Sequence, residues 1–246
     1  MTEFHVDQLR VRAFATRAEM GARAGADAAA EIRAHGNARV ILASAPSQNE
    51  LLDALVRTDL DWSRVTLFHM DEYAGLDAAH PASFRRYQRE RVLDRIRPAA
   101  FHGIAGEAEA DAECARYAAL LATAPIHVVC LGIGENGHIA FNDPPVADFA
   151  DPALVKVVAL DDACRRQQVN DGCFPTLDEV PWHALTLTIP TLLRGGALFC
   201  AVPGPRKANA VRDALRGPVA TSCPASILRT HPHATLYLDA DSAALL

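Results

Sequence analysis

The chain has 246 residues, of which 50% are hydrophobic and 22% charged, and its formal net charge is -6. This length fits one large α/β domain or two small ones, with enough chain to bury a core. The acidic balance lacks the basic excess that attracts nucleic acid or an anionic membrane surface. No apolar run approaches the roughly 18 residues of a membrane helix. We therefore expect neither nucleic acid nor membrane as a partner.

The N-terminal segment carries charges from Glu3 onward and lacks the apolar stretch of a secretory signal. The six cysteines are spread singly, with no two separated by only two residues, which excludes zinc ribbons and redox pairs. A disulfide framework is not expected, because a chain of this size needs no covalent staples. We predict a cytoplasmic protein in which most cysteines are small buried apolar residues.

Short aliphatic and β-branched runs alternate with longer amphipathic or alanine-rich stretches, as in a parallel sheet with crossover helices. The predicted strands are 39–43, 64–70, 126–131, 154–160, 185–190, 197–202 and 235–238. The predicted helices are 16–34, 48–57, 81–92, 108–122 and 206–215. No repeat or linker interrupts this pattern. We predict a single doubly wound, Rossmann-like α/β domain over residues 1–246, with a mostly parallel central sheet of about seven strands.

Ligands of open parallel sheets bind beyond the carboxyl ends of the strands. One such end carries Ser44, Ala45 and Ser47 ahead of a predicted helix. Hydroxyls beside the free N–H groups of a helix N-terminus suit a phosphate, and helix capping without a ligand is the alternative. Another end places Lys207 at the start of a helix, where an ammonium is unfavourable unless it faces an anion. An ordinary surface lysine is the alternative there.

Two adjacent carboxylates, Asp71 and Glu72, follow another predicted strand. A partly desolvated carboxylate at this place suits the removal of a proton from carbon, and a solvated acidic turn is the alternative.

The densest motif is segment 132–144, in which three glycines precede or flank the side chains of Asn136, His138 and Asp143. The glycines let the backbone approach a ligand, and a purely structural histidine is the alternative. The glycine spacing superficially matches a dinucleotide fingerprint, but no acidic residue ends a strand about 20 residues later. We therefore exclude a nicotinamide site.

These motifs together resemble the glucosamine-6-phosphate deaminase and 6-phosphogluconolactonase family, more particularly its deaminase/isomerase branch. The main matches are Met-Asp-Glu-Tyr at 70–73 and Gly-His-Ile-Ala-Phe-Asn at 137–142, with further ones at 184–186, 217–218, 224–226 and 231–232. The run that follows His138 favours the deaminase branch, because lactonases usually continue with a Thr-Ala-Ser type of sequence. The resemblance implies a sugar phosphate as ligand and no metal or redox cofactor.

The resemblance also implies roles for individual residues. Asp71 would move a proton between C2 and C1 of the sugar during aldose–ketose isomerisation. His138 would assist ring opening, supported by Asn136 and Asp143. The 6-phosphate would bind to Lys207 and to the loop that holds Ser44, Ala45 and Ser47. Glu72 and Gly137 would make further contacts with the substrate.

The chain departs from the family pattern at several of these positions. Asn136 replaces an aspartate and cannot take up a proton, and Asp143 replaces a glutamate. Pro46 removes a backbone donor from the phosphate loop. The family's arginine-bearing Asn-Ser-Arg-Phe-Phe stretch has no counterpart in 164–172. That segment leaves three possible substrate contacts open, namely Arg165, Arg166 and Gln168.

The leading hypothesis is an amino-sugar phosphate deaminase/isomerase. It would convert glucosamine 6-phosphate, or an epimer such as galactosamine 6-phosphate, to a ketose 6-phosphate and ammonia. A 6-phosphogluconolactonase and a catalytically inactive sugar-phosphate-binding regulator are the alternatives. The sequence assigns neither the epimer nor an allosteric site, and it allows a homo-oligomer.

Overall fold

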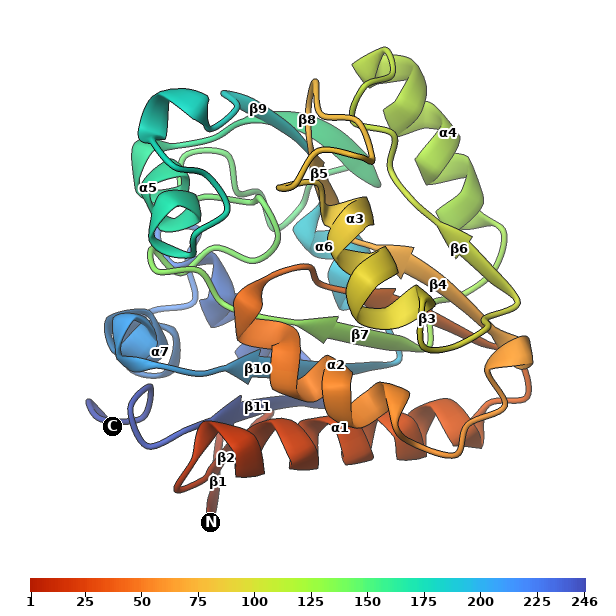
Figure 1. The fold of residues 1–246 in the computed structure, drawn as a ribbon. Helices are drawn as coiled ribbons and strands as arrows, with labels where there is room; N and C mark the ends of the chain where they lie inside the picture. Colours follow the sequence, from red (N-terminus) through yellow and green to blue (C-terminus); the bar gives the residue numbers. More distant parts are fainter.

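Eleven strands and seven α-helices make up the computed structural model, which describes residues 1–246 (Figure 1). Eight strands form a large sheet: β1 (Thr2–Val6), β2 (Leu9–Ala13), β3 (Ala38–Leu42), β4 (Val65–His69), β6 (Ala100–His102), β7 (Val128–Leu131), β10 (Ala197–Val202) and β11 (Ala234–Leu238). Three form a small sheet: β5 (Asp71–Tyr73), β8 (Val155–Ala159) and β9 (His183–Leu187). The helices are α1 (Arg17–Ala34), α2 (Asn49–Val56), α3 (Phe84–Gln88), α4 (Ala110–Ala122), α5 (Asp162–Asn170), α6 (Ile189–Leu193) and α7 (Ala208–Arg216).

The large sheet has the strand order β1-β2-β11-β10-β7-β3-β4-β6. Its neighbouring strands are parallel except for the antiparallel pair β1 and β2. The small sheet has the order β5-β9-β8 and is antiparallel throughout. The predicted α/β fold with a mostly parallel central sheet is confirmed.

The central strands are buried on both faces, which explains their continuous apolar sequences. Val40 and Leu42 of β3 pack with α1 and α2 on one face, whereas Ile41 between them packs on the other. That other face is covered by α4, α6, α7 and the small sheet, and Figure 1 shows the small sheet lying above the large one. The sheet is therefore wound on both sides, as predicted.

Two predicted strands lie outside the central sheet. Residues 154–160 and 185–190 correspond to β8 and β9. These two strands pair with each other in the small sheet, and neither belongs to the large sheet. β9 also ends at Leu187, because Pro190 lies in the first turn of α6. A β-branched run is apolar in either sheet, so the sequence pattern did not distinguish the two positions.

Besides β5 and α6, three further features were not predicted. The β1–β2 hairpin is short and largely polar, and it turns at Asp7, whose φ is 52°. β6 has only three residues at the edge of the large sheet. Helix α5 is strongly polar and gives little apolar periodicity. All three lack the buried apolar pattern on which the other assignments rested.

An aromatic cluster joins the small sheet to its surroundings. The Tyr73 ring lies 4.9 Å from the Phe84 ring, 5.3 Å from Phe141 and 5.2 Å from Phe174, measured between centroids. We call these four residues the aromatic cluster. It ties β5 to α3, to the segment after β7 and to the segment after α5.

All six cysteines are free, and four of them are buried, in agreement with the prediction. None of the helices has the length and apolar character that crossing a membrane requires.

Candidate active site

A cavity opens beyond the carboxyl ends of β3, β4, β7 and β10, where a ligand was expected. Segments 43–48, 70–71 and 132–134 line it together with residues from α5. Six of the predicted site residues also line it: Ser44, Ala45, Ser47, Asp71, His138 and Lys207. Residues far apart in sequence thus meet at one place because parallel strands end at the same edge.

Asp71 begins β5 and is held there by the neighbouring strand. It pairs with Thr186 of β9, and the N–H of Leu187 donates to the carbonyl of Met70 at 2.8 Å. The Asp71 side chain lines the cavity although the residue is only 6% exposed. Burial, and secondly the charge of Glu72, raise its pKa well above the usual range for aspartate. A carboxyl in this state is a stronger base once ionised than a solvated one.

Glu72 does not line the cavity, contrary to the prediction. Its carboxylate is fully buried and accepts hydrogen bonds from the Ser83 hydroxyl at 2.9 Å and from the N–H groups of Phe84 and Arg85 at 3.0 Å. These are free donors at the start of α3, so Glu72 caps that helix. Adjacent strand residues point to opposite faces, which turns Glu72 away when Asp71 faces the cavity. The solvated-turn alternative is also wrong for both residues.

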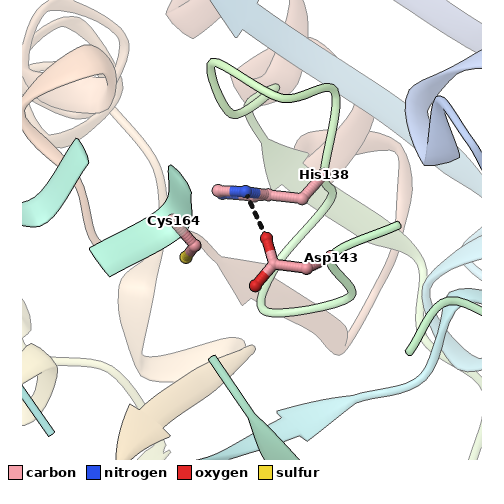
Figure 2. A group of neighbouring side chains, drawn as sticks. All are labelled: His138, Asp143 and Cys164. Atoms are coloured by element: carbon pink, nitrogen blue, oxygen red, sulfur yellow. Dashed lines mark ion pairs between the residues drawn. The ribbon is translucent and has the colours of Figure 1, made fainter. Parts of the chain in front are cut away.

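His138 lines the cavity and faces a buried carboxylate. Its Nδ1 lies 2.9 Å from Oδ1 of Asp143. The dashed line in Figure 2 marks this ion pair. Its ring lies against Gly134, where an added Cβ would fall 2.2 Å from Cε1 of the imidazole. Only glycine therefore leaves room for the ring. The position of Gly134 in the motif is explained by this contact with the histidine.

The turn after His138 is fixed by β9. The side-chain amide of Asn142 donates to the carbonyls of Ile139 at 3.0 Å and Leu187 at 2.8 Å. The N–H of Phe141 donates to the Thr186 hydroxyl at 3.1 Å. Strand β9 thus positions both the Asp71 segment and the His138 segment.

Asn136 and Asp143 lie behind His138, outside the cavity lining. The Asn136 amide donates to Asp143 at 3.0 Å and to Asp161 at 3.2 Å, while its Oδ1 accepts from the N–H of His138 at 3.1 Å. Burial alone would raise the pKa of Asp143, but His138 and the Asn136 amide lower it below its usual value. An aspartate at 136 would put a third carboxylate beside Asp143 and Asp161. The amide supplies donors to both of them instead.

Gly137 lies outside the cavity lining, contrary to the predicted substrate contact. Its φ is 85°, and an added Cβ would fall 2.8 Å from Sγ of Cys223. Its N–H donates to Gly134 at 3.1 Å and its carbonyl accepts from Ala225 at 2.8 Å, so both backbone groups are occupied. Glycine is needed here for the conformation and for the close approach of Cys223.

His138, Asp143 and Cys164 bring a nitrogen, an oxygen and a sulfur within 4.8 Å of one another (Figure 2). This is a donor set that some metals accept. However, burial raises the pKa of Cys164 well above the usual thiol range, with Asp143 and Asp161 adding to the effect, and the thiolate is the form that binds metal. Asp143 already accepts from Asn136 and faces His138. A hydrogen-bonded network explains the set better than a metal site.

One end of the cavity is formed by the loop at 44–47 and Lys207, the residues predicted to bind a phosphate. The Gln88 amide donates to the Ser44 hydroxyl oxygen at 2.9 Å, which leaves the hydroxyl hydrogen of Ser44 free to donate to a ligand. The Tyr87 hydroxyl donates to the carbonyl of Ala45 at 2.8 Å and so holds the loop from the same side. No hydroxyl of the loop caps a helix, which excludes the capping alternative.

Lys207 is 6% exposed and lines the cavity, so the surface-lysine alternative is wrong. Burial lowers its pKa, although the charges of Asp171 and Glu135 oppose this effect. No carboxylate forms an ion pair with its ammonium. A buried cation without a fixed partner is suited to an anionic ligand.

Pro46, the residue expected to weaken the anion site, is the first residue of a 3₁₀ turn at 46–48, where a missing N–H costs little.

Helix α5 contributes cavity residues that were largely missed. Gln167, Gln168 and Asp171 line the cavity, whereas both arginines of the helix point elsewhere. Arg165 donates to the carbonyl of Leu177 at 2.7 Å, and Arg166 is exposed beside Asp162. The prediction had left Arg165, Arg166 and Gln168 open, and only Gln168 reaches the cavity. The sequence did not predict this helix, because its polar residues show little apolar periodicity. It therefore could not indicate which side chains face the cavity.

The fold and the cavity together define a class of α/β proteins that bind an anionic small molecule beyond the carboxyl ends of a parallel sheet. The family model described as "Glucosamine-6-phosphate isomerases/6-phosphogluconolactonase" matches residues 13–237. The chain belongs to this family.

Several relatives of this chain are named glucosamine-6-phosphate deaminase. A glucosamine-6-phosphate deaminase of Listeria monocytogenes is 36% identical over 206 residues, which cover 83% of this chain and 86% of the relative. One of Pseudarthrobacter chlorophenolicus is 39% identical over 201 residues, covering 80% and 76%. Among solved structures, a monomeric glucosamine-6-phosphate deaminase matches with a TM-score of 0.90 and 32% identity over 96% of this chain and 99% of that one. A 6-phosphogluconolactonase from Trypanosoma brucei shares the fold at a TM-score of 0.76, with 18% identity over the full length of both chains.

Proposed function

We propose that the protein is an amino-sugar phosphate deaminase/isomerase that converts glucosamine 6-phosphate, or its galacto epimer, and water to a ketose 6-phosphate and ammonia. The observation that carries this proposal is the buried Asp71 carboxylate in the same cavity as His138 and Lys207. The names of the relatives that are more than 30% identical support the same activity.

In this proposal, Asp71 is the base that carries the proton. It takes the proton from C2 of the open-chain amino sugar, which forms an enolamine, and returns it to C1. The C2 iminium that results is hydrolysed by water, so that the C–N bond breaks and ammonia leaves. The C2 proton is weakly acidic because it lies next to the C1 carbonyl of the open-chain sugar, and a buried carboxylate with a raised pKa matches the task of removing it.

His138 assists opening of the sugar ring by moving a proton between the ring oxygen and the C1 hydroxyl. Asp143 orients the imidazole, since the distance between Nδ1 and Oδ1 is 2.9 Å. Asn136 keeps the Asp143 carboxylate in place and does not itself transfer a proton. The relay therefore uses one histidine and one carboxylate.

The 6-phosphate lies at the other end of the cavity. The ammonium of Lys207 neutralises part of its charge, and Ser44, Ser47 and the N–H groups of the loop donate to its oxygens. The acidic net charge of the chain does not oppose this binding, because Lys207 acts at contact distance in a partly dry site.

A lactonase needs a histidine to activate water and an anion site, but it has no use for a second buried base in the cavity. Asp71 lining the cavity therefore favours the deaminase. An inactive regulator would bind the sugar phosphate without turnover. Comparing the activities of wild type and Asp71→Asn distinguishes both alternatives from the proposal.

The test is ammonia release, with parallel detection of ketose 6-phosphate, from glucosamine 6-phosphate and galactosamine 6-phosphate. Wild type and Asp71→Asn are compared. Ammonia release that disappears in the variant supports the proposal and identifies the epimer. Saturable binding without ammonia from either sugar would replace it with the regulator, and hydrolysis of 6-phosphogluconolactone unaffected by the variant would replace it with the lactonase.

Three further predictions belong to the same proposal. Residues 1–246 act as one domain, since both sheets contribute to the cavity. The location is cytoplasmic, for which six free cysteines are the supporting observation. A homo-oligomer is not required by the cavity, which is lined by one chain, and one structural relative is described as monomeric.

A further inference from the structure

Two adjacent glutamines of α5 line the cavity but differ in how their amides are used. Both ends of Gln167 are occupied by the protein: Oε1 accepts from the N–H of Glu135 at 2.8 Å, and Nε2 donates to Asp171 at 3.3 Å. Gln168 has one occupied end, since its Oε1 accepts from the Tyr73 hydroxyl at 2.6 Å. No protein group accepts from its Nε2. Gln168 therefore presents an unused donor to the cavity.

Tyr73 fixes the orientation of this amide. Its ring is fully buried in the aromatic cluster, and Gln168 is the only partner of its hydroxyl. If the amide were reversed, the hydroxyl hydrogen would be left without an acceptor in apolar surroundings, which is unfavourable. The oxygen of Gln168 therefore faces Tyr73, and the NH₂ group faces the ligand.

The position of Gln168 along the cavity follows from its neighbours. Tyr73 is two residues after Asp71 on β5, so both side chains lie on the same face of the strand. Asp171, which directly follows α5, lines the cavity together with Lys207. With C2 at Asp71 and the 6-phosphate at Lys207, as in the proposed function, Gln168 would face the middle of the carbon chain, because it lines the same cavity and its partner Tyr73 adjoins the Asp71 strand. The carbon midway between C2 and C6 is C4.

We propose that Gln168 donates to the C4 hydroxyl oxygen of the sugar phosphate and, held by Tyr73, determines which C4 epimer is accepted. This inference rests on the proposed function and deepens it. Gln168 is a specificity-determining residue that contacts the substrate, and Tyr73 is a positioning residue that acts through it. Neither removes or adds a proton.

The experiment compares the two C4 epimers, glucosamine 6-phosphate and galactosamine 6-phosphate, in binding and in turnover. Binding is measured by calorimetry in the Asp71→Asn background, where turnover is suppressed, and turnover is measured with Asp71 intact. Gln168→Met keeps the side-chain size without hydrogen bonding, and Gln167→Met is the matched control. Tyr73→Phe leaves Gln168 in place but releases its amide.

We expect Gln168→Met to weaken the preferred epimer roughly tenfold and to reduce the preference to near unity, as loss of one neutral hydrogen bond implies. Tyr73→Phe should shift the preference the same way by a smaller factor. Gln167→Met should lower the melting temperature but leave the preference unchanged, because its amide bonds only to protein. A preference that Gln168→Met leaves within twofold of its original value, or one that Gln167→Met changes equally, would overturn the inference.

The two proposals fail in different ways. Absence of ammonia from both epimers would reject the deaminase while the binding preference still tests Gln168. Normal turnover with an unchanged epimer preference in Gln168→Met would reject the role of Gln168 and leave the deaminase standing.

Discussion

The two ends of the cavity are held by different sheets. The anion end, with Ser44 and Lys207, lies on loops that leave β3 and β10 of the large parallel sheet. The reacting end, with Asp71 and the turn after His138, is fastened to β9 of the small antiparallel sheet. In the proposed function one end binds the phosphate and the other carries the chemistry, and each is held by a different sheet. Substitutions at the two ends should therefore change different kinetic constants.

The largest expected effect tests the reacting end with two neighbouring carboxylates. Asp71→Asn should lower kcat by about 10²- to 10⁴-fold, because it removes the proton-carrying base. Glu72→Gln should act mainly on stability, lowering the free energy of unfolding by about 1–3 kcal/mol, because an amide would oppose the N–H donors of α3. Steady-state kinetics and thermal unfolding of both variants check this. Equal loss of kcat in the two variants, with equal melting temperatures, would contradict the separation of roles.

The next effect tests the anion end. Lys207→Met removes a charge-assisted contact worth about 1.5–3 kcal/mol, which corresponds to a rise in KM of about 10- to 150-fold. The expected change in kcat is small, since Lys207 does not reach the reacting carbons. The measurement is kcat and KM on the preferred substrate, with inorganic phosphate as a competitive inhibitor that should lose affinity in parallel. A fall in kcat with unchanged KM would show that the two ends are not separable.

The pH dependence should differ between the ends because burial raises the pKa of the Asp71 carboxyl and lowers the pKa of the Lys207 ammonium. The pKa of Asp71 is raised in the folded protein, so the folded state holds this proton more tightly than the unfolded chain does. The stabilisation from Asp71 is present at low pH and is lost as pH rises through the raised pKa. Asp71→Asn should therefore raise the melting temperature at neutral pH, and the difference should vanish below the ordinary aspartate range. A variant that is less stable than wild type at neutral pH would contradict this.

The lowered pKa of Lys207 predicts a change in ligand affinity at alkaline pH. Burial favours the neutral amine, so the ammonium is lost at a lower pH than in a solvated lysine. Inhibition by inorganic phosphate should weaken above neutral pH in wild type, as Lys207 deprotonates. In Lys207→Met the already weak inhibition should not change over the same range. Inhibition constants measured at increasing pH check both statements.

The smallest effect concerns Arg206, next to Lys207 but half-exposed. Its guanidinium forms ion pairs with Glu135 at 3.1 Å and Asp171 at 2.7 Å. Exposed ion pairs are worth about 0–1 kcal/mol. Arg206→Gln should therefore change KM by about fivefold at most and leave kcat unchanged. A larger rise in KM would mean that the anion end depends on two cations.

The sequence predicted the large sheet better than the small one for a physical reason. Val40, Ile41 and Leu42 are buried on both faces of β3, so their apolar run predicts a central strand directly. Val155 to Ala159 form an equally β-branched run, but the choice of sheet depends on β5 and β9, which lie far away in the sequence. The polar helix α5 was not predicted because its sequence has little apolar periodicity.

The same contrast holds within the site. Asp71, His138 and Lys207 were predicted correctly as cavity residues, because each directly follows a strand or lies in a recognisable motif. The orientation of Glu72 toward α3 and the difference between Gln167 and Gln168 could not be predicted. Both depend on hydrogen-bond partners that are not neighbours in the sequence.

The aromatic cluster has a consequence for which molecules the cavity can convert. By fastening β5 to α3 and to the segment after β7, it fixes how far the base on the small sheet lies from the anion site on the large sheet. In the proposed function, a sugar held by its phosphate at Lys207 presents C2 to Asp71 only if its carbon chain has the matching length. The packing of these rings, of which Phe84 and Phe141 also line the cavity, would therefore select substrates by chain length.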